Sequence, residues 1–222
     1  MSMKIYSGTG GSPAMFDKLL ELGACTKIVK ETDYVSQCYV NDDIYFRYGV
    51  PAAGNTEYIW IDVYNNSPSV YIPIYGIASA TTSTTQGLKW KIVEFDTGYL
   101  FGLATTSGNN YTPVLNMFIG KTVDKNGVES QGVVCREKNT SNYIVLTGNI
   151  IDTLDKRSYG VIKSEYNTVL TPMCNLYSSD KFVDIFSITL SPYTSRDRRF
   201  VLNNDYFYTS DDGLIAIRFG GI

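Results

Sequence analysis

Hydrophobic and polar residues alternate along most of the chain, in short runs that end at turn-forming residues. Runs of this kind predict strands over Ser36–Val40 and Ile44–Tyr48, because Asn41-Asp42-Asp43 separates them as a turn. Short strands spaced about 8–12 residues apart are typical of an antiparallel β-sandwich. The pattern therefore predicts a mainly β fold in which antiparallel sheets pack like a sandwich. The further predicted strands are Tyr58–Tyr64, Val70–Ile74, Lys89–Phe95, Tyr99–Ala104, Tyr206–Thr209 and Leu214–Phe219.

Near the N-terminus the hydrophobic residues follow the spacing of a helix rather than the alternation of a strand. Lys4-Ile5-Tyr6 predicts a short strand, and a short α-helix should follow it, with Ser12 as N-cap and Pro13 at the first helical position. Gly23 is predicted to end this helix, because glycine readily adopts the left-handed backbone conformation of a C-terminal cap. The apolar stripe that would face the core comprises Met15, Phe16, Leu19, Leu20 and Leu22.

The organisation of the chain predicts a single β-rich domain over residues 1–222, since no repeat of fixed period divides it. Residues 79–86 are nearly all serine and threonine, and they predict an exposed loop or linker. A second helix is predicted over Ile150–Arg157.

The most informative pattern lies in the predicted strand Tyr58–Tyr64. At a period of two, Ile59, Ile61 and Val63 should face the core. The opposite side carries the candidate binding or interface residues. Three interpretations of this side remain open. Aromatic residues anchor many subunit interfaces, aromatic rings also stack on sugars, and a strand buried on both sides needs no partner at all. These candidate residues are Tyr58, Trp60, Asp62 and Tyr64.

The amino-acid composition excludes some kinds of catalytic and metal site and disfavours others. The 222 residues include no histidine, which excludes a Ser-His-Asp triad and imidazole ligands for zinc. The net charge of −3 disfavours nucleic-acid binding, which needs a basic patch. The widely spaced cysteines form no Cys-x-x-Cys pair, so we expect free thiols rather than metal ligands. Accordingly we expect no enzyme, no cofactor and no metal. The cysteines are Cys25, Cys38, Cys135 and Cys174.

Two local patterns suggest ligand binding or catalysis, and each has a simpler interpretation. The small-residue loop Ser7–Ser12 precedes a helix, where backbone N–H groups bind anions, but it lacks the lysine of a phosphate-binding loop. Glu94 and Asp96 share one side of a predicted strand, whereas a glycosidase needs two carboxylates that flank its substrate. We interpret the first pattern as the entry to the helix and the second as a strand that ends in a turn.

The N-terminal order of features resembles a group of bacteriophage virion proteins. The resemblance is carried by Lys4-Ile5-Tyr6-Ser7-Gly8, then Ser12-Pro13 and a helix that ends at Gly23. Tyrosine- and tryptophan-rich β segments follow in that group, as they do here over Tyr58–Phe101, and the C-terminal Gly213-Leu214-Ile215-Ala216-Ile217 fits the same picture. The resemblance implies a structural part of a phage tail, baseplate or capsid surface. It carries over no catalytic or binding residue.

From the resemblance we expect a structural component of a bacteriophage or prophage particle, made in the host bacterial cytoplasm and located in the virion. Its partners would be other virion proteins and further copies of itself, because symmetric self-assembly is the usual state of such parts. No signal peptide and no apolar run long enough to span a membrane is recognisable, so no membrane insertion is expected. The alternative is a carbohydrate-binding or receptor-binding module that holds a cell-surface glycan on the aromatic strand face.

Overall fold

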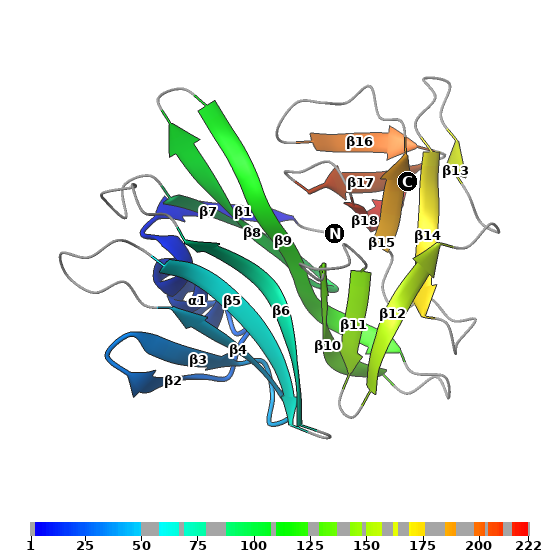
Figure 1. Cartoon of the computed structure of the whole chain (residues 1–222). Helices are drawn as coiled ribbons and strands as arrows, with labels where there is room; N and C mark the ends of the chain where they lie inside the picture. The colour runs from blue at the N-terminus through cyan, green and yellow to red at the C-terminus, as the bar shows by residue number, and fades with distance from the viewer. Residues whose placement is uncertain are drawn as a thin grey trace.

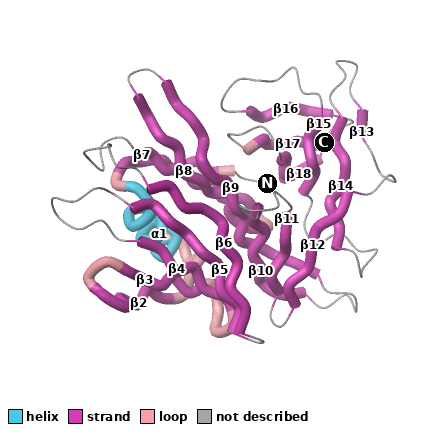
Figure 2. Tube along the Cα trace, viewed as in Figure 1, coloured by secondary structure: helices cyan, strands magenta, loops and turns pink. Residues whose placement is uncertain are grey.

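A computed structural model describes residues 3–49, 58–66, 69–78, 88–107, 110–123, 129–136, 143–147, 150–156, 162–163, 169–175, 185–189, 198–202, 204–210 and 215–221, with side chains for part of them. Within these residues the chain is almost entirely β, with one short helix, α1 (Gly11–Glu21), near the N-terminus (Figure 2). The predicted fold class, mainly β and antiparallel with one short N-terminal helix, is confirmed.

The larger sheet contains thirteen antiparallel strands. Its first half runs in the spatial order β1 (Lys4–Thr9), β7 (Leu88–Phe95), β8 (Gly98–Ser107), β9 (Asn110–Val123), β10 (Glu129–Arg136), β11 (Tyr143–Thr147) and β12 (Ile150–Lys156). The second half continues with β14 (Val169–Asn175), β15 (Ile185–Thr189), β18 (Ile215–Gly221), β17 (Asp205–Thr209) and β16 (Arg198–Leu202), while β13 (Ile162–Lys163) pairs with β14.

The smaller sheet is a five-stranded antiparallel meander in chain order. Its strands are β2 (Lys27–Thr32), β3 (Val35–Tyr39), β4 (Ile44–Gly49), β5 (Tyr58–Asn66) and β6 (Ser69–Ala78). The predicted turn joins β3 to β4, and its geometry explains why these residues suit it. The side-chain Oδ1 of Asn41 accepts hydrogen bonds from the backbone N–H groups of Asp43 and Ile44, both at 2.9 Å.

Two apolar clusters lie on opposite faces of the strands β7 to β10. Because side chains alternate along a strand, Ile92 and Met117 face the smaller sheet and α1. Val93 and Phe118 face the other way and pack with Ile217 of β18. Figure 1 shows β2 to β6 and α1 on one side of β7 to β9, and β15 to β18 on the other. The middle of the larger sheet is therefore buried on both faces.

Phe16 of α1 joins the two sheets. Its ring stacks on Tyr48 with the ring centroids 4.4 Å apart, and its centroid lies 5.3 Å from that of Phe46, also on β4. On the other side it meets the ring of Phe101 on β8, with centroids 6.5 Å apart. All four rings are buried. The helix thus fills the space between the sheets, which explains the apolar stripe in its sequence.

The start of the helix differs from the prediction. Gly10 occupies the N-cap position with a φ of 103°, makes no side-chain capping bond, and is followed by Gly11 at a φ of 68°. Ser12 is buried within the first turn and is not the cap. Two glycines with positive φ turn the chain directly from β1 into α1, and other residues adopt this conformation only with strain. The prediction that Gly23 ends the helix is confirmed, because Gly23 lies just beyond it in the left-handed conformation, with a φ of 78°.

The second predicted helix is wrong. Residues 150–156 form β12, which pairs with β11 on one side and β14 on the other. The spacing of the apolar residues suits a helix, but the segment is rich in β-branched isoleucine and threonine. Its two neighbouring strands also supply the backbone hydrogen bonds that a helix would otherwise make. The predicted loop over residues 79–86 lies outside the described residues.

Cys25, Cys38 and Cys135 are buried in the core and form no disulfide, as predicted. The side chain of Cys174 lies outside the described residues. A hydrogen bond with Cys25, together with burial, raises the pKa of the Cys38 thiol above its ordinary value. Since the thiolate is the reactive form, the Cys38 thiol is held in its unreactive state, and both side chains fill space in the core as small apolar groups.

Candidate functional site

The strand β5 presents two different faces, as its alternation predicts. Ile61 and Val63 are fully buried in the core. Trp60, Asp62 and Tyr64 belong to the opposite face and are partly exposed. Tyr58 lies in the strand, but its side chain is outside the described residues. The strand is therefore not buried on both sides, and three of the four candidate residues lie on a face that a partner can reach.

A row of stacked tyrosines crosses this outer face of the smaller sheet. The strand register places Tyr39 of β3 opposite Tyr45 of β4, and Tyr45 opposite Tyr64 of β5. The ring centroids are 4.9 Å apart in the first pair and 5.0 Å apart in the second. At the β2 end, Nζ of Lys27 lies 4.4 Å from the centroid of the Tyr39 ring. We call Tyr39, Tyr45 and Tyr64 the tyrosine row.

Arg47 of β4 lies beside the tyrosine row and connects three strands. Its guanidinium donates hydrogen bonds to both carboxylate oxygens of Glu31 on β2, at 2.8 and 2.9 Å, and to the hydroxyl of Tyr64 on β5. The guanidinium carbon also lies 5.2 Å from the centroid of the Trp60 ring. Asp62 lies opposite Arg47 in the strand register. Candidate residues of β5 are thus brought together with residues of β2 and β4.

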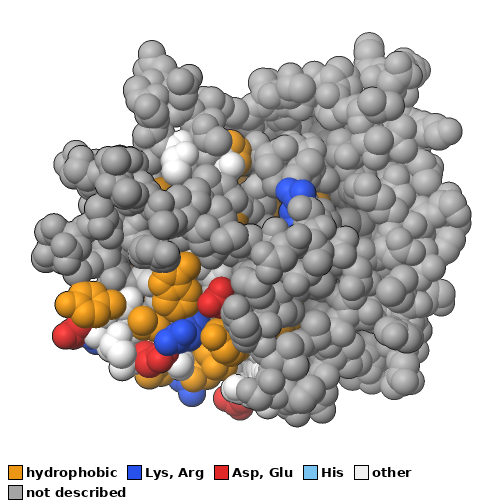
Figure 3. All heavy atoms as spheres, viewed as in Figure 1, with side chains coloured by type: hydrophobic (Ala, Val, Ile, Leu, Met, Phe, Trp, Pro, Cys, Tyr) orange, Lys and Arg blue, Asp and Glu red, His pale blue; other side chains and the backbone are white. Residues whose placement is uncertain are grey.

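The outer face is aromatic and electrically balanced. Two positive side chains, Lys27 and Arg47, accompany two negative ones, Glu31 and Asp62, among its described residues. Figure 3 shows hydrophobic side chains interspersed with both signs of charge over the smaller sheet, in the lower left of the view. The exposed Val29 of β2 extends this surface, since it aligns with Gln37 and through it with Arg47.

The environment of the face shifts the protonation of its groups. The hydrogen bond from Arg47 lowers the pKa of Glu31 below its ordinary value, against a smaller opposing effect of burial. Burial raises the pKa of Tyr45, and the neighbouring Tyr39 and Tyr64 raise it further. Near neutral pH Tyr45 therefore keeps a neutral hydroxyl group, while Glu31 and Arg47 form a charged pair.

Replacing Glu31 with glutamine is expected to lower the free energy of unfolding by about 0.5 kcal/mol near pH 7, a small effect because the side chain is about one-third exposed. The pKa of Glu31 is lower in the folded chain, so its contribution is present above the unfolded value and is lost as the pH falls through the folded value. Urea unfolding should therefore give a lower free energy of unfolding for Glu31→Gln than for the original protein at about pH 7, but equal values at about pH 2.5. An equal difference at both pH values would contradict the assignment.

The stacking limits what the face can bind. Tyr45 has a tyrosine ring against it on each side, and Trp60 has the Arg47 guanidinium near its ring. A sugar stacks on an open ring face, whereas these contacts turn ring edges and hydroxyl groups toward the outside. Ring edges and hydroxyls suit packing against another protein surface better than stacking on a sugar.

The sequence analysis missed Tyr39, Tyr45, Arg47 and Glu31. A signal for the first three was present, because alternation along β3 and β4 places them on the side away from the buried Cys38 and Phe46. Only the register between strands shows that these side chains meet those of β5.

Glu94 of β7 contacts two residues of the neighbouring strand β1. The hydroxyl of Tyr6 donates a hydrogen bond of 2.7 Å to its Oε2, and Nζ of Lys4 lies 3.8 Å from its Oε1. This hydrogen bond is the main cause of a raised pKa of Tyr6. Asp96 is exposed in the turn after β7. Glu94 therefore connects β7 to β1, and Asp96 belongs to the turn that follows β7.

The small residues before α1 also have a structural explanation. The indole of Trp90 packs so closely over Gly8 that an added Cβ would lie 2.5 Å from a ring carbon. Its Nε1 donates a hydrogen bond of 3.1 Å to the carbonyl oxygen of Thr9. Together with the positive φ of Gly10 and Gly11, this packing accounts for the glycines of the loop.

Comparison with known proteins found no matching family model, no similar curated protein and no similar solved structure. In the part of the chain that the structure describes, no three histidine, cysteine, aspartate or glutamate side chains gather as a metal site would require. The helix that is described there is too short and too polar to cross a membrane. The surface chemistry of the smaller sheet is therefore the main structural guide to function.

Proposed function

We propose that the chain is a structural component of a bacteriophage or prophage particle and acts by protein–protein assembly through the outer face of its smaller sheet. The observation that carries this proposal is the tyrosine row, an ordered aromatic surface braced by Arg47. Tyrosine, tryptophan and arginine are the residues most enriched at the energetic centres of interfaces. The N-terminal resemblance to virion proteins supports the proposal that this assembly takes place in a phage particle.

The proposed occupant of this face is a second copy of the chain. A strongly charged partner would meet no opposite net charge here, because Lys27 and Arg47 balance Glu31 and Asp62. A second identical face matches this neutrality, and a two-fold axis lets positive groups of one copy meet negative groups of the other. Two sheet faces also pack readily at about 10 Å, as in a sandwich. The face is thus suited to isologous pairing.

Replacing Val29 with lysine is expected to weaken self-association at least about tenfold, which corresponds to about 1.4 kcal/mol. The change places an unbalanced charge on the face in both copies, so that each copy repels the other. Val29 is 41% exposed, so the substitution should leave the fold intact. Sedimentation velocity over a concentration series measures the effect.

The matched control is Ile5→Lys, at a residue that is 37% exposed on β1 of the other sheet. This variant should associate as the original protein does, whereas Trp60→Ala and Tyr64→Ala should weaken association as Val29→Lys does. Equal association of Val29→Lys and the original protein would contradict the proposed face. Saturable glycan binding that is lost in Trp60→Ala, without self-association, would instead favour the carbohydrate-binding alternative.

A further inference from the structure

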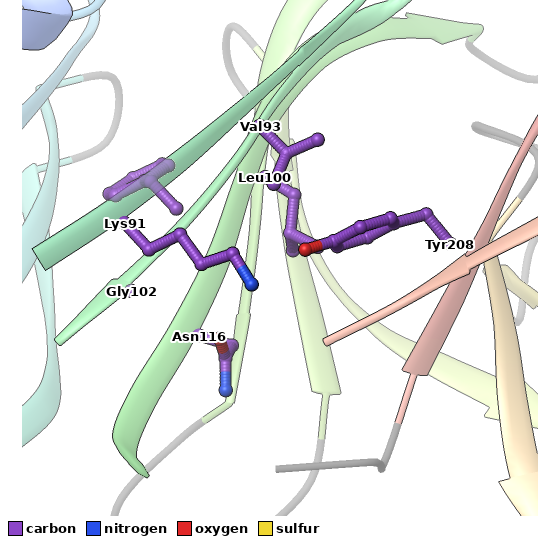
Figure 4. A pocket seen from close by; sticks show the side chains of 7 residues that line it. Lys91, Val93, Leu100, Gly102, Asn116 and Tyr208 are labelled. Atoms are coloured by element: carbon purple, nitrogen blue, oxygen red, sulfur yellow. The ribbon is translucent and has the colours of Figure 1, made fainter. Parts of the chain in front are cut away.

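The hollow shown in Figure 4 leaves little room for a ligand. It lies between Val93 of β7, Leu100 of β8, Asn116 of β9 and Tyr208 of β17, and it has room for about one water molecule. A larger contact surface lies at the edge of the smaller sheet.

Strand β2 forms an open edge of the smaller sheet. It ends the strand order, with β3 beside it and no described strand on its other side, as Figure 1 shows. Its residues are exposed except for Ile28, which packs partly buried against the core. An edge strand presents backbone N–H and C=O groups with which another strand can pair. A second chain can therefore extend the sheet at this edge.

The strand register shows which backbone groups point out of this edge. The N–H of Val40, just after β3, donates a hydrogen bond of 2.9 Å to the carbonyl oxygen of Ile44 on β4. Because the direction of the backbone groups alternates along a strand, every second residue of β3 pairs with β4 and the others pair with β2. Val29 lies opposite one of the latter, so the backbone groups of Ile28 and Lys30 point outward.

Two copies of β2 complement each other when they pair antiparallel around Val29. On the two-fold axis Val29 then meets Val29 of the second copy, and the outward backbone groups of Ile28 meet those of Lys30. On the outer face of the sheet, Lys27 lies opposite Glu31 of the second copy, and the symmetry repeats this pair. Oppositely charged cross-strand pairs stabilise a sheet.

The neighbouring registers lack this complementarity. A shift of two residues in one direction places Lys30 opposite Lys30 of the second copy, and like charges directly opposite are destabilising. A shift in the other direction places Lys27 opposite Val29, without an ion pair. A shift of one residue leaves the outward backbone groups without partners facing them. The charges of β2 therefore favour one register.

Both charged groups remain able to form the cross-strand pair. Glu31 accepts hydrogen bonds from Arg47, but a carboxylate has about four acceptor positions and Glu31 is about one-third exposed. Lys27 is exposed and its Nζ lies over the ring of Tyr39, at the end of the tyrosine row. The paired edges would thus continue the tyrosine row of one copy into the charged residues of the next.

We propose that β2 pairs antiparallel around Val29 with β2 of a second copy, so that two smaller sheets form one continuous sheet. The inference deepens the proposed function, on which it rests for the identity of the partner, but it uses the edge of the sheet rather than its outer face. Paired edges would place two tyrosine rows on one extended surface.

The test is disulfide cross-linking of the full chain carrying Val29→Cys, with copper phenanthroline as the oxidant. The two Cα atoms of such a pair lie about 4.5 Å apart, within the range that a disulfide spans. Dimer formation on a non-reducing gel should be at least about tenfold faster than in Ile5→Cys, at a residue that is 37% exposed on β1. The original protein under the same conditions gives the background of its own cysteines. Equal rates in Val29→Cys and Ile5→Cys would overturn the proposal.

Lys30→Cys tests the register. Lys30 is also exposed, but in the proposed pairing it lies opposite Ile28 of the second copy, so Lys30→Cys should cross-link no faster than Ile5→Cys. Faster cross-linking of Lys30→Cys than of Val29→Cys would overturn the proposed register.

Charge reversal tests the ion pairs. Lys27→Glu and Glu31→Lys, each added to Val29→Cys, should slow cross-linking at least about threefold, because like charges then lie opposite each other. A mixture of the two variants restores opposite charges and should recover the rate. A mixture that cross-links no faster than either variant alone would contradict the pairing.

Trp60→Ala separates the edge from the outer face. Added to Val29→Cys, it should leave cross-linking unchanged, because Trp60 lies on β5, three strands from the edge. Loss of cross-linking would mean that the contact runs through the outer face, which would overturn edge pairing. Retained cross-linking, with a solution mass that Trp60→Ala does not lower, would support edge pairing and contradict the proposed face.

Discussion

Replacing Phe16 with alanine is expected to lower the free energy of unfolding by about 3–5 kcal/mol, which corresponds to a fall of about 10 °C in Tm for a chain of this size. Phe16 is fully buried and contacts the rings of Tyr48 and Phe46 in one sheet and Phe101 in the other. Removing its ring opens a cavity between the sheets, beside the direct contact of Phe46 with Phe101, whose ring centroids lie 5.8 Å apart. Urea and thermal unfolding measure the loss.

The control for this prediction is Tyr34→Ala, which removes a ring of similar size that is 59% exposed beyond the end of β2. Exposed substitutions usually change stability by less than about 0.5 kcal/mol. Phe16→Leu should lie between the two, because leucine keeps part of the packing volume. A loss of less than about 1 kcal/mol in Phe16→Ala would show that α1 does not fasten the sheets together.

Replacing Gly98 with alanine is expected to cost about 2–4 kcal/mol, from backbone strain and overpacking together. Gly98 begins β8 with a φ of 150° and lies opposite Gly120 of β9. An added Cβ would lie 2.3 Å from the carbonyl oxygen of Ile119 and 2.6 Å from Cα of Gly120. Because both neighbours are backbone atoms, relief requires the hairpin itself to move.

Gly23→Ala separates the two causes of this loss. Gly23 also has a positive φ, of 78°, but an added Cβ there would meet nothing within 4 Å. Its substitution should therefore cost only the conformational strain, roughly 1 kcal/mol. Equal losses for Gly98→Ala and Gly23→Ala in urea unfolding would mean that strain alone matters at Gly98. A larger loss at Gly98 confirms the close approach of β8 and β9.

Local sequence signals predicted much of the strand content. Asn41 turns the chain between β3 and β4 through its own side-chain hydrogen bonds, so the turn is encoded within a few residues. The alternation of Ile61 and Val63 with Trp60 and Asp62 likewise fixed which side of β5 faces the core. The helix was visible from its apolar stripe, because α1 presents one side to the space between the sheets.

Features that depend on distant partners escaped the sequence analysis. Residues 150–156 have helical apolar spacing, but pairing with β11 and β14 makes them a strand. Ser12 is a good N-cap by residue type, yet Gly10 and Gly11 set the start of α1. The same limit applies to the tyrosine row, since Tyr39 and Tyr64 meet Tyr45 only through the register of three strands.

The measurement that most directly tests the proposed role is the mass of the original protein in solution, by size-exclusion chromatography with light scattering over a range of concentrations. If the outer face of the smaller sheet pairs with a second copy, the mass should rise with concentration from that of one 24.8 kDa chain to a discrete multiple of it. A mass of one chain at every concentration would contradict self-assembly through the tyrosine row.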